Sequence, residues 1–171
     1  MTSELLILRL VHVLGGIFWV GSTMLTTFFL IPAIATVGPA GGQVFAAVQR
    51  RKLSVFLLAA SILTVLSGLR LMWITSGGYS SAYFETAPGL GFATAGMSAI
   101  VAFLLGMLIG RPAAMRAAML GGTIASAASE RRAELVEEVE RLRRRSAVAG
   151  TVVAVLLAFA AAGMAVARYL A

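Results

Sequence analysis

Four long apolar runs constrain the fold of this chain more than any other feature of its sequence. A helix needs about 20 mostly apolar residues to cross the hydrocarbon core of a bilayer. Helices are expected because each backbone polar group within lipid must find a partner inside the protein. The runs predict transmembrane helices at about residues 5–34, 53–75, 92–110 and 147–170. We therefore predict an all-α integral membrane protein, a single four-helix bundle that covers residues 1–171.

The composition agrees with a chain that lies mostly in lipid. Hydrophobic residues make up 60% of the sequence and charged residues 12%, which is about half the charged fraction of a soluble domain. Cysteine is absent, so disulfides and thiolate chemistry are excluded. The formal charge of +7 does not indicate nucleic-acid binding, because the basic residues flank apolar runs. No basic segment or cleavage site precedes the first run, which we interpret as a mature helix.

The distribution of basic residues predicts the orientation in the membrane. The first connection ends in Arg50-Arg51-Lys52, whereas the second, residues 76–91, contains no basic residue. Connections rich in lysine and arginine remain in the cytoplasm. We therefore expect the first and third connections inside and both termini outside. The third connection carries eight arginines: Arg111, Arg116, Arg131, Arg132, Arg141, Arg143, Arg144 and Arg145.

Residues 113–146 of the third connection are predicted to form a cytoplasmic helical segment before the fourth transmembrane helix. Glu137 and Arg141, and Glu140 and Arg144, have the i,i+4 spacing of helical ion pairs. Leu135, Val139 and Leu142 form a short apolar stripe. This pattern favours a solvated extension of the fourth helix, and a helix that docks a partner or dimerises is the alternative interpretation.

Three ionisable residues stand out among those inside the predicted spans, where such residues are costly and often functional. They are Arg9 and His12 in the first helix and Arg70 in the second. Arg9 and His12 are three residues apart and therefore share a helix face. The predicted orientation places all three residues in the outer half of the membrane.

His12, the single histidine of the sequence, is a candidate axial ligand for haem iron. Gly16, one turn below on the same face, would leave room for a flat macrocycle, and Trp19 would provide an aromatic wall. Arg9 and Arg70 would bind the two propionates, because arginine pairs well with carboxylates. The alternative interpretation is that the arginines extend to the interface and that His12 only forms a hydrogen bond.

The segment from Arg9 to Gly21, RLVHVLGGIFWVG, resembles the first helix of a group of bacterial membrane proteins. This group includes the CopD-type copper-resistance domain and the HemJ-type membrane protoporphyrinogen oxidase. The stretch from Ser67 to Leu71 also resembles their second helix. The HemJ-type resemblance implies haem b bound through His12, and the bacterial cytoplasmic membrane as the location.

A second haem ligand is not evident, because the third and fourth helices contain no histidine and no lysine. The missing lysine departs from the HemJ-type pattern and argues against protoporphyrinogen oxidation. Met97 or Met164 would supply a thioether ligand. Alternatively, the iron is five-coordinate, or a second chain in a homodimer completes the site.

Three functions are consistent with these residues. The first is a b-type haem protein for electron transfer or haem-related chemistry, with a redox protein or quinone as partner; this includes a haem-dependent oxidoreductase. The second is a CopD-like copper protein, in which methionine and histidine would bind the metal. The third is a cofactor-free membrane subunit, in which Arg9 and Arg70 would bind lipid phosphates or pair with Glu4 or Glu85. The sequence contains no phosphate loop, zinc motif or nucleophile elbow.

Overall fold

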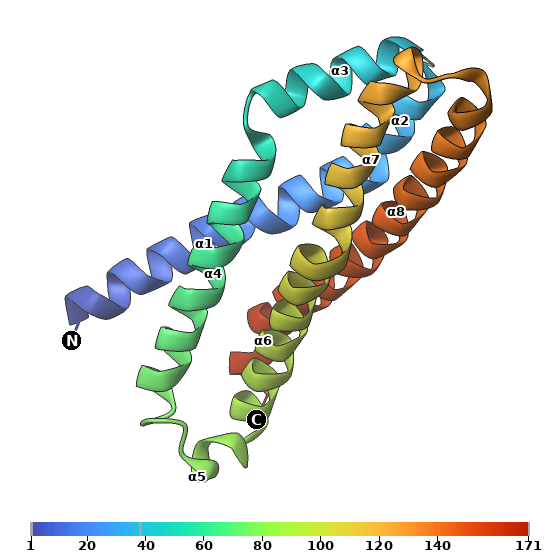
Figure 1. Cartoon of the computed structure of the whole chain (residues 1–171). Coiled ribbons are helices and arrows are strands. Elements are labelled where there is room, and N and C mark those ends of the chain that lie inside the picture. The colour runs from blue at the N-terminus through green and yellow to red at the C-terminus, as the bar shows by residue number, and fades with distance from the viewer. Residues whose placement is uncertain (1, 38, 171) are drawn as a thin grey trace.

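The computed structural model describes residues 2–37 and 39–170, which form helices joined by short turns (Figure 1). Four helical stretches are long and apolar enough to cross a membrane: Ser3–Thr36, Leu53–Thr75, Ala87–Ser126 and Ser129–Tyr169. The predicted all-α class is confirmed, and the helices have the length and composition that an integral membrane protein requires.

The second stretch is a single helix, whereas the other three stretches each comprise more than one helical segment. The elements, in chain order, are α1 (Thr2–Leu25), η1 (Thr26–Leu30), α2 (Ile31–Thr36), α3 (Pro39–Arg50), α4 (Leu53–Thr75), α5 (Ser81–Phe84), α6 (Ala87–Leu105), η2 (Gly106–Gly110), α7 (Arg111–Thr123), η3 (Ile124–Ser126), α8 (Ser129–Val166) and η4 (Ala167–Tyr169). The first and third stretches are each interrupted once by a π-helical turn, η1 or η2.

Prolines explain both π-helical turns. Pro32 and Pro112 stand at the start of α2 and α7, immediately after η1 and η2. A proline lacks the backbone N–H and clashes with the carbonyl four residues earlier, and the wider π turn accommodates this defect within a continuous helix. The third helix therefore does not end at the Arg111-Pro112 step that closes the apolar run, but continues through α7 to Thr123.

The helices pack mainly as two antiparallel pairs, α1 with α4 and α6 with α8. The pairs meet at a core cluster in which all four helices contribute one or two buried side chains. In the α6–α8 pair, Ala95 is fully buried and a Cβ on Gly163 would lie 3.0 Å from its Cβ. Small residues thus let these two backbones approach closely. The core cluster consists of Trp19, Ala60, Ala102, Val153 and Leu157.

The predicted helical segment at residues 113–146 forms α7 and the first part of α8, which pack against each other as a hairpin. Leu142 is buried against Ala113 and Ala117. Ion pairs form at i,i+3 spacing, Glu138 with Arg141 and Glu140 with Arg143, rather than at the predicted i,i+4 spacing. Both spacings bring side chains together on a helix surface, so sequence distance alone does not select between them.

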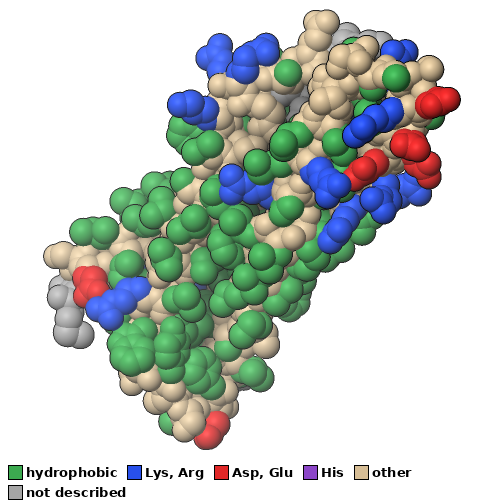
Figure 2. All heavy atoms as spheres, in the orientation of Figure 1, with side chains coloured by type: hydrophobic (Ala, Val, Ile, Leu, Met, Phe, Trp, Pro, Cys, Tyr) green, Lys and Arg blue, Asp and Glu red, His purple; other side chains and the backbone are tan. Residues whose placement is uncertain are grey.

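Charged and apolar side chains occupy different parts of the surface. In Figure 2, hydrophobic side chains cover the middle of the molecule, whereas lysine and arginine gather where α3, α7 and the start of α8 lie. On α1, Leu6, Leu10 and Ile17 each expose 60% or more of their surface. Such contiguous apolar exposure is unfavourable in water but suits contact with lipid.

Candidate functional site between α1 and α4

His12 lies half-buried on the face of α1 that packs against α4. Its Nδ1 is 2.9 Å from the backbone carbonyl oxygen of Thr64. A carbonyl oxygen only accepts hydrogen bonds, so Nδ1 must carry the proton and donate it. In this tautomer the lone pair is on Nε2, which is the atom left to bind a metal.

Gly68 makes this position of the imidazole possible. A Cβ added at residue 68 would lie 2.8 Å from Cε1 and 3.1 Å from Nδ1 of His12. Contacts under 3 Å between such atoms are not tolerated in packed proteins. The absence of a side chain at Gly68 thus lets the ring lie directly against the backbone of α4.

Buried hydroxyl groups on α4 line the same interface. Ser61, Thr64 and Ser67 are each at least 93% buried and recur every third residue. Their hydroxyls donate to carbonyl oxygens of the preceding turn, and Ser67 Oγ also lies 3.4 Å from His12 Nδ1. Ser61 and Thr64 were not predicted from the sequence as site residues, and Ser67 entered only within the stretch that resembles the family's second helix. Their signal was the spacing of three polar residues within an otherwise apolar helix.

Gly15 and Gly16 face Thr64 across the interface. A Cβ on Gly15 would lie 2.7 Å from Thr64 Oγ1, and one on Gly16 would lie 3.7 Å from Thr64 Cγ2. Both glycines therefore let α1 approach α4 closely. The sequence predicted that Gly16 leaves room for a macrocycle. In the structure, the space beside Gly16 borders the Thr64 side chain.

Arg70 and Glu4 form an ion pair between α4 and α1. Arg70 donates from Nε and Nη2 to Oε1 of Glu4, at 2.9 and 2.7 Å, and each side chain is about half exposed. Arg9 is exposed on α1, and no salt bridge to it is formed within the described residues. The structure thus realises, for Arg70, the pairing with Glu4 that the sequence left as an alternative.

The candidate residues lie on one side of the core cluster. Arg70 follows Ala60 by ten residues in α4, and Arg9 precedes Trp19 by ten residues in α1. Ten residues of helix span about 15 Å. His12 is seven residues from Trp19, or about 10 Å along α1. The imidazole is therefore about one helical turn closer to the core cluster than the two arginines.

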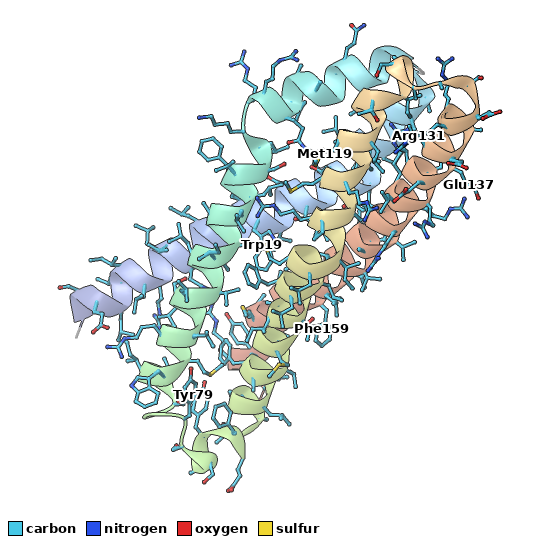
Figure 3. All side chains as sticks on the ribbon, in the orientation of Figure 1. Trp19, Tyr79, Met119, Arg131, Glu137 and Phe159 are labelled. Atoms are coloured by element: carbon cyan, nitrogen blue, oxygen red, sulfur yellow. The ribbon has the colours of Figure 1, made fainter. Side chains whose placement is uncertain are left out.

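The remaining predicted residues lie elsewhere. Trp19 is 6% exposed and packs edge-to-face on Phe103, with the two ring centroids 6.3 Å apart. It lies between the two helix pairs (Figure 3). Met97 exposes 60% of its surface, and Met164 is half-buried. Met97 lies on α6 and Met164 on α8, and not on the two helices that form the His12 interface. Trp19 belongs to the core cluster.

The donor set of this interface fits an axial ligand rather than a multidentate metal site. Within the described residues, no group of three or more histidine, aspartate or glutamate side chains could hold a metal ion together. A five-coordinate haem iron would need one imidazole from the protein, and a ligating histidine commonly donates its other N–H to a backbone carbonyl. The hydrogen bond from His12 to Thr64 has this form.

These observations define a polytopic helical membrane protein with a polar, histidine-containing interface between two of its helices. Comparison of the chain with models of known protein families, with curated proteins and with solved structures found no match. Its function is therefore argued from the residues of this interface.

Proposed function

We propose that this protein binds haem b through His12, in a bacterial cytoplasmic membrane, and takes part in electron transfer or haem-related redox chemistry. The observation that carries the proposal is the hydrogen bond from His12 Nδ1 to the carbonyl oxygen of Thr64. It leaves Nε2 as the free lone pair and prevents the ring from rotating. When bound, haem would supply a one-electron redox couple or an open coordination position.

Arg9 and Arg70 are proposed to bind the propionates. Both lie about 15 Å from the core cluster by helical rise, which equals half the thickness of a typical hydrocarbon core. If the core cluster lies at the bilayer midplane, the two guanidinium groups lie near the headgroups, where carboxylates are also favoured. Arg70 is half exposed, so Glu4 and a propionate would share or exchange it.

The orientation we propose places both termini outside and the arginine-rich α7–α8 hairpin in the cytoplasm. This orientation rests on the basic residues of the first and third connections, because connections rich in lysine and arginine remain in the cytoplasm. His12, Arg9 and Arg70 then belong to the outer half of the membrane. A redox protein or quinone would reach the site from that side. The second axial ligand of the iron would come from Met97 or Met164, or from a second chain in a homodimer.

The experiment that tests the proposal is a visible absorption spectrum of the detergent-purified protein, oxidised and then reduced with dithionite. A Soret band and reduced α and β bands at near-stoichiometric haem are expected. The variant His12→Ala should lose the bands at comparable expression, and imidazole added to His12→Gly should restore them. A wild-type protein that stays colourless after haem is supplied, or a His12→Ala variant with full haem, would refute the proposal.

The Glu4–Arg70 pair supports a second candidate, a membrane subunit without a cofactor. In that case the pair joins α1 to α4, His12 serves only as a packing hydrogen-bond donor, and the α7–α8 hairpin docks a partner protein. This candidate predicts no haem in the purified protein and little effect of His12 substitution on assembly. For copper, Met97 offers no comparable support, because most of its surface faces away from the helix contacts.

A further inference from the structure

An open groove lies along η2 and α7, far from His12. The groove is shallow and open to the outside, with a volume of about 630 Å³. In Figure 3, Met119 lies on this helix, near the arginine-rich end of the molecule. The residues that line the groove include Met107, Arg111, Met115, Arg116 and Met119.

The groove combines exposed apolar side chains with two cations. Met115 exposes 54% of its surface and Met119 72%. Arg111 is half-buried beside them, and no salt bridge to it is formed within the described residues. Arg116 bonds to Glu138 at 2.8 Å but leaves 66% of its side chain exposed. Flexible methionines with nearby guanidinium groups suit an amphiphile that carries a negative charge.

The level of the groove agrees with a lipid as the occupant. Arg111 follows Ala102 by nine residues, and Lys52 precedes Ala60 by eight residues. These separations correspond to about 12–14 Å of helix from the core cluster, close to half the hydrocarbon thickness. If the core cluster lies at the bilayer midplane, Met107 lies on the apolar side of this boundary and Arg111 at the boundary itself.

We propose that the groove binds an anionic phospholipid, with the phosphate held by Arg111 and Arg116 and the beginning of an acyl chain packed on Met107 and Met115. Arginine suits this position because its planar guanidinium donates two parallel hydrogen bonds to phosphate oxygens. The lipid would cover the exposed methionines where the α7–α8 hairpin leaves the membrane. A second copy of the chain and a partner protein are the other possible occupants, and the experiment separates them.

Native mass spectrometry of the full chain, released from detergent after incubation with phosphatidylglycerol or phosphatidylcholine, tests the proposal. We expect about tenfold more bound phosphatidylglycerol than phosphatidylcholine. Arg111→Gln/Arg116→Gln should lose about thirtyfold of the phosphatidylglycerol affinity, because each basic residue near a membrane surface contributes about 1 kcal/mol and about 1.4 kcal/mol corresponds to a factor of ten. Arg131→Gln/Arg132→Gln is the matched control, because it removes two charges from the tip of the same hairpin.

Three results would overturn the proposal. Equal binding of the two lipids would show that the arginines do not recognise charge, and an equal loss in the control variant would indicate general attraction by the hairpin. A dimer or a bound protein that excludes lipid from the groove would assign it to another occupant. Glu138→Gln breaks the ion pair with Arg116 but keeps both arginines, so this variant should retain phosphatidylglycerol.

Discussion

The Nδ1 of His12 donates a hydrogen bond to the carbonyl oxygen of Thr64 at 2.9 Å, which links α1 to α4. Rotation of the ring would break this bond and leave polar groups unpaired, which is unfavourable in lipid. The bond therefore holds the ring in one orientation and one tautomer. The chemistry available to His12 therefore depends on a backbone atom of another helix.

Gly68→Ala tests whether this orientation matters. The new Cβ would lie 2.8 Å from His12 Cε1, so the ring must move and its bond to Thr64 must weaken. We expect about a tenfold or larger loss of haem affinity, as for other changes in the groups that orient a ligand, and a lower thermal stability in detergent. Gly96→Ala is the control, because its Cβ would meet nothing within 4 Å. Equal haem titrations for the two variants would contradict the role given to Gly68.

Glu4 and Arg70 are expected to respond differently to substitution. Arg70→Ala should weaken haem retention because it removes a propionate partner. Glu4→Gln should retain haem. It should lower the free energy of unfolding by less than about 1 kcal/mol, because exposed ion pairs are weak and this pair is about half exposed. Haem dissociation measured by transfer to apomyoglobin distinguishes the two. If Glu4→Gln loses haem as fast as Arg70→Ala, the pair acts by holding α1 against α4.

Trp19 is expected to contribute to the fold rather than to the cofactor. It is 6% exposed and contacts Phe103 in the core cluster. Trp19→Ala should destabilise the protein by about 3–5 kcal/mol through the cavity it leaves. Trp19→Phe should restore most of that stability and leave the haem spectrum unchanged. Thermal unfolding in detergent and the reduced spectrum measure these effects, and an altered spectrum in a stable Trp19→Phe variant would place the indole at the haem.

The orientation is accessible to labelling because the sequence contains no cysteine. Ser80 in the turn after α4 and Ser129 at the start of α8 are both exposed. A membrane-impermeant maleimide should label Ser80→Cys in intact spheroplasts, and Ser129→Cys only after the membrane is permeabilised. The reverse pattern would invert the orientation and place His12 in the cytoplasmic half.

The helical class and the four apolar spans could be predicted because they depend on local sequence, namely the length and hydropathy of each run. The path of the third helix could not, because Pro112 normally ends a helix. Only the preceding π turn allows it to continue into α7. The sequence also indicated ion pairs in residues 113–146, but not the residues that would form them.

For the candidate site too, some features follow from the local sequence and others only from the tertiary structure. The sequence by itself determined that His12, Arg9 and Arg70 are ionisable groups inside apolar helices, since this follows from composition and spacing. The tertiary structure alone decided that His12 meets Thr64 and Gly68, that Glu4 binds Arg70 and that Trp19 belongs to the core. These contacts join residues more than fifty positions apart, and they depend on the rotation and register of α1 against α4, which small residues and buried hydrogen bonds select only when the helices pack.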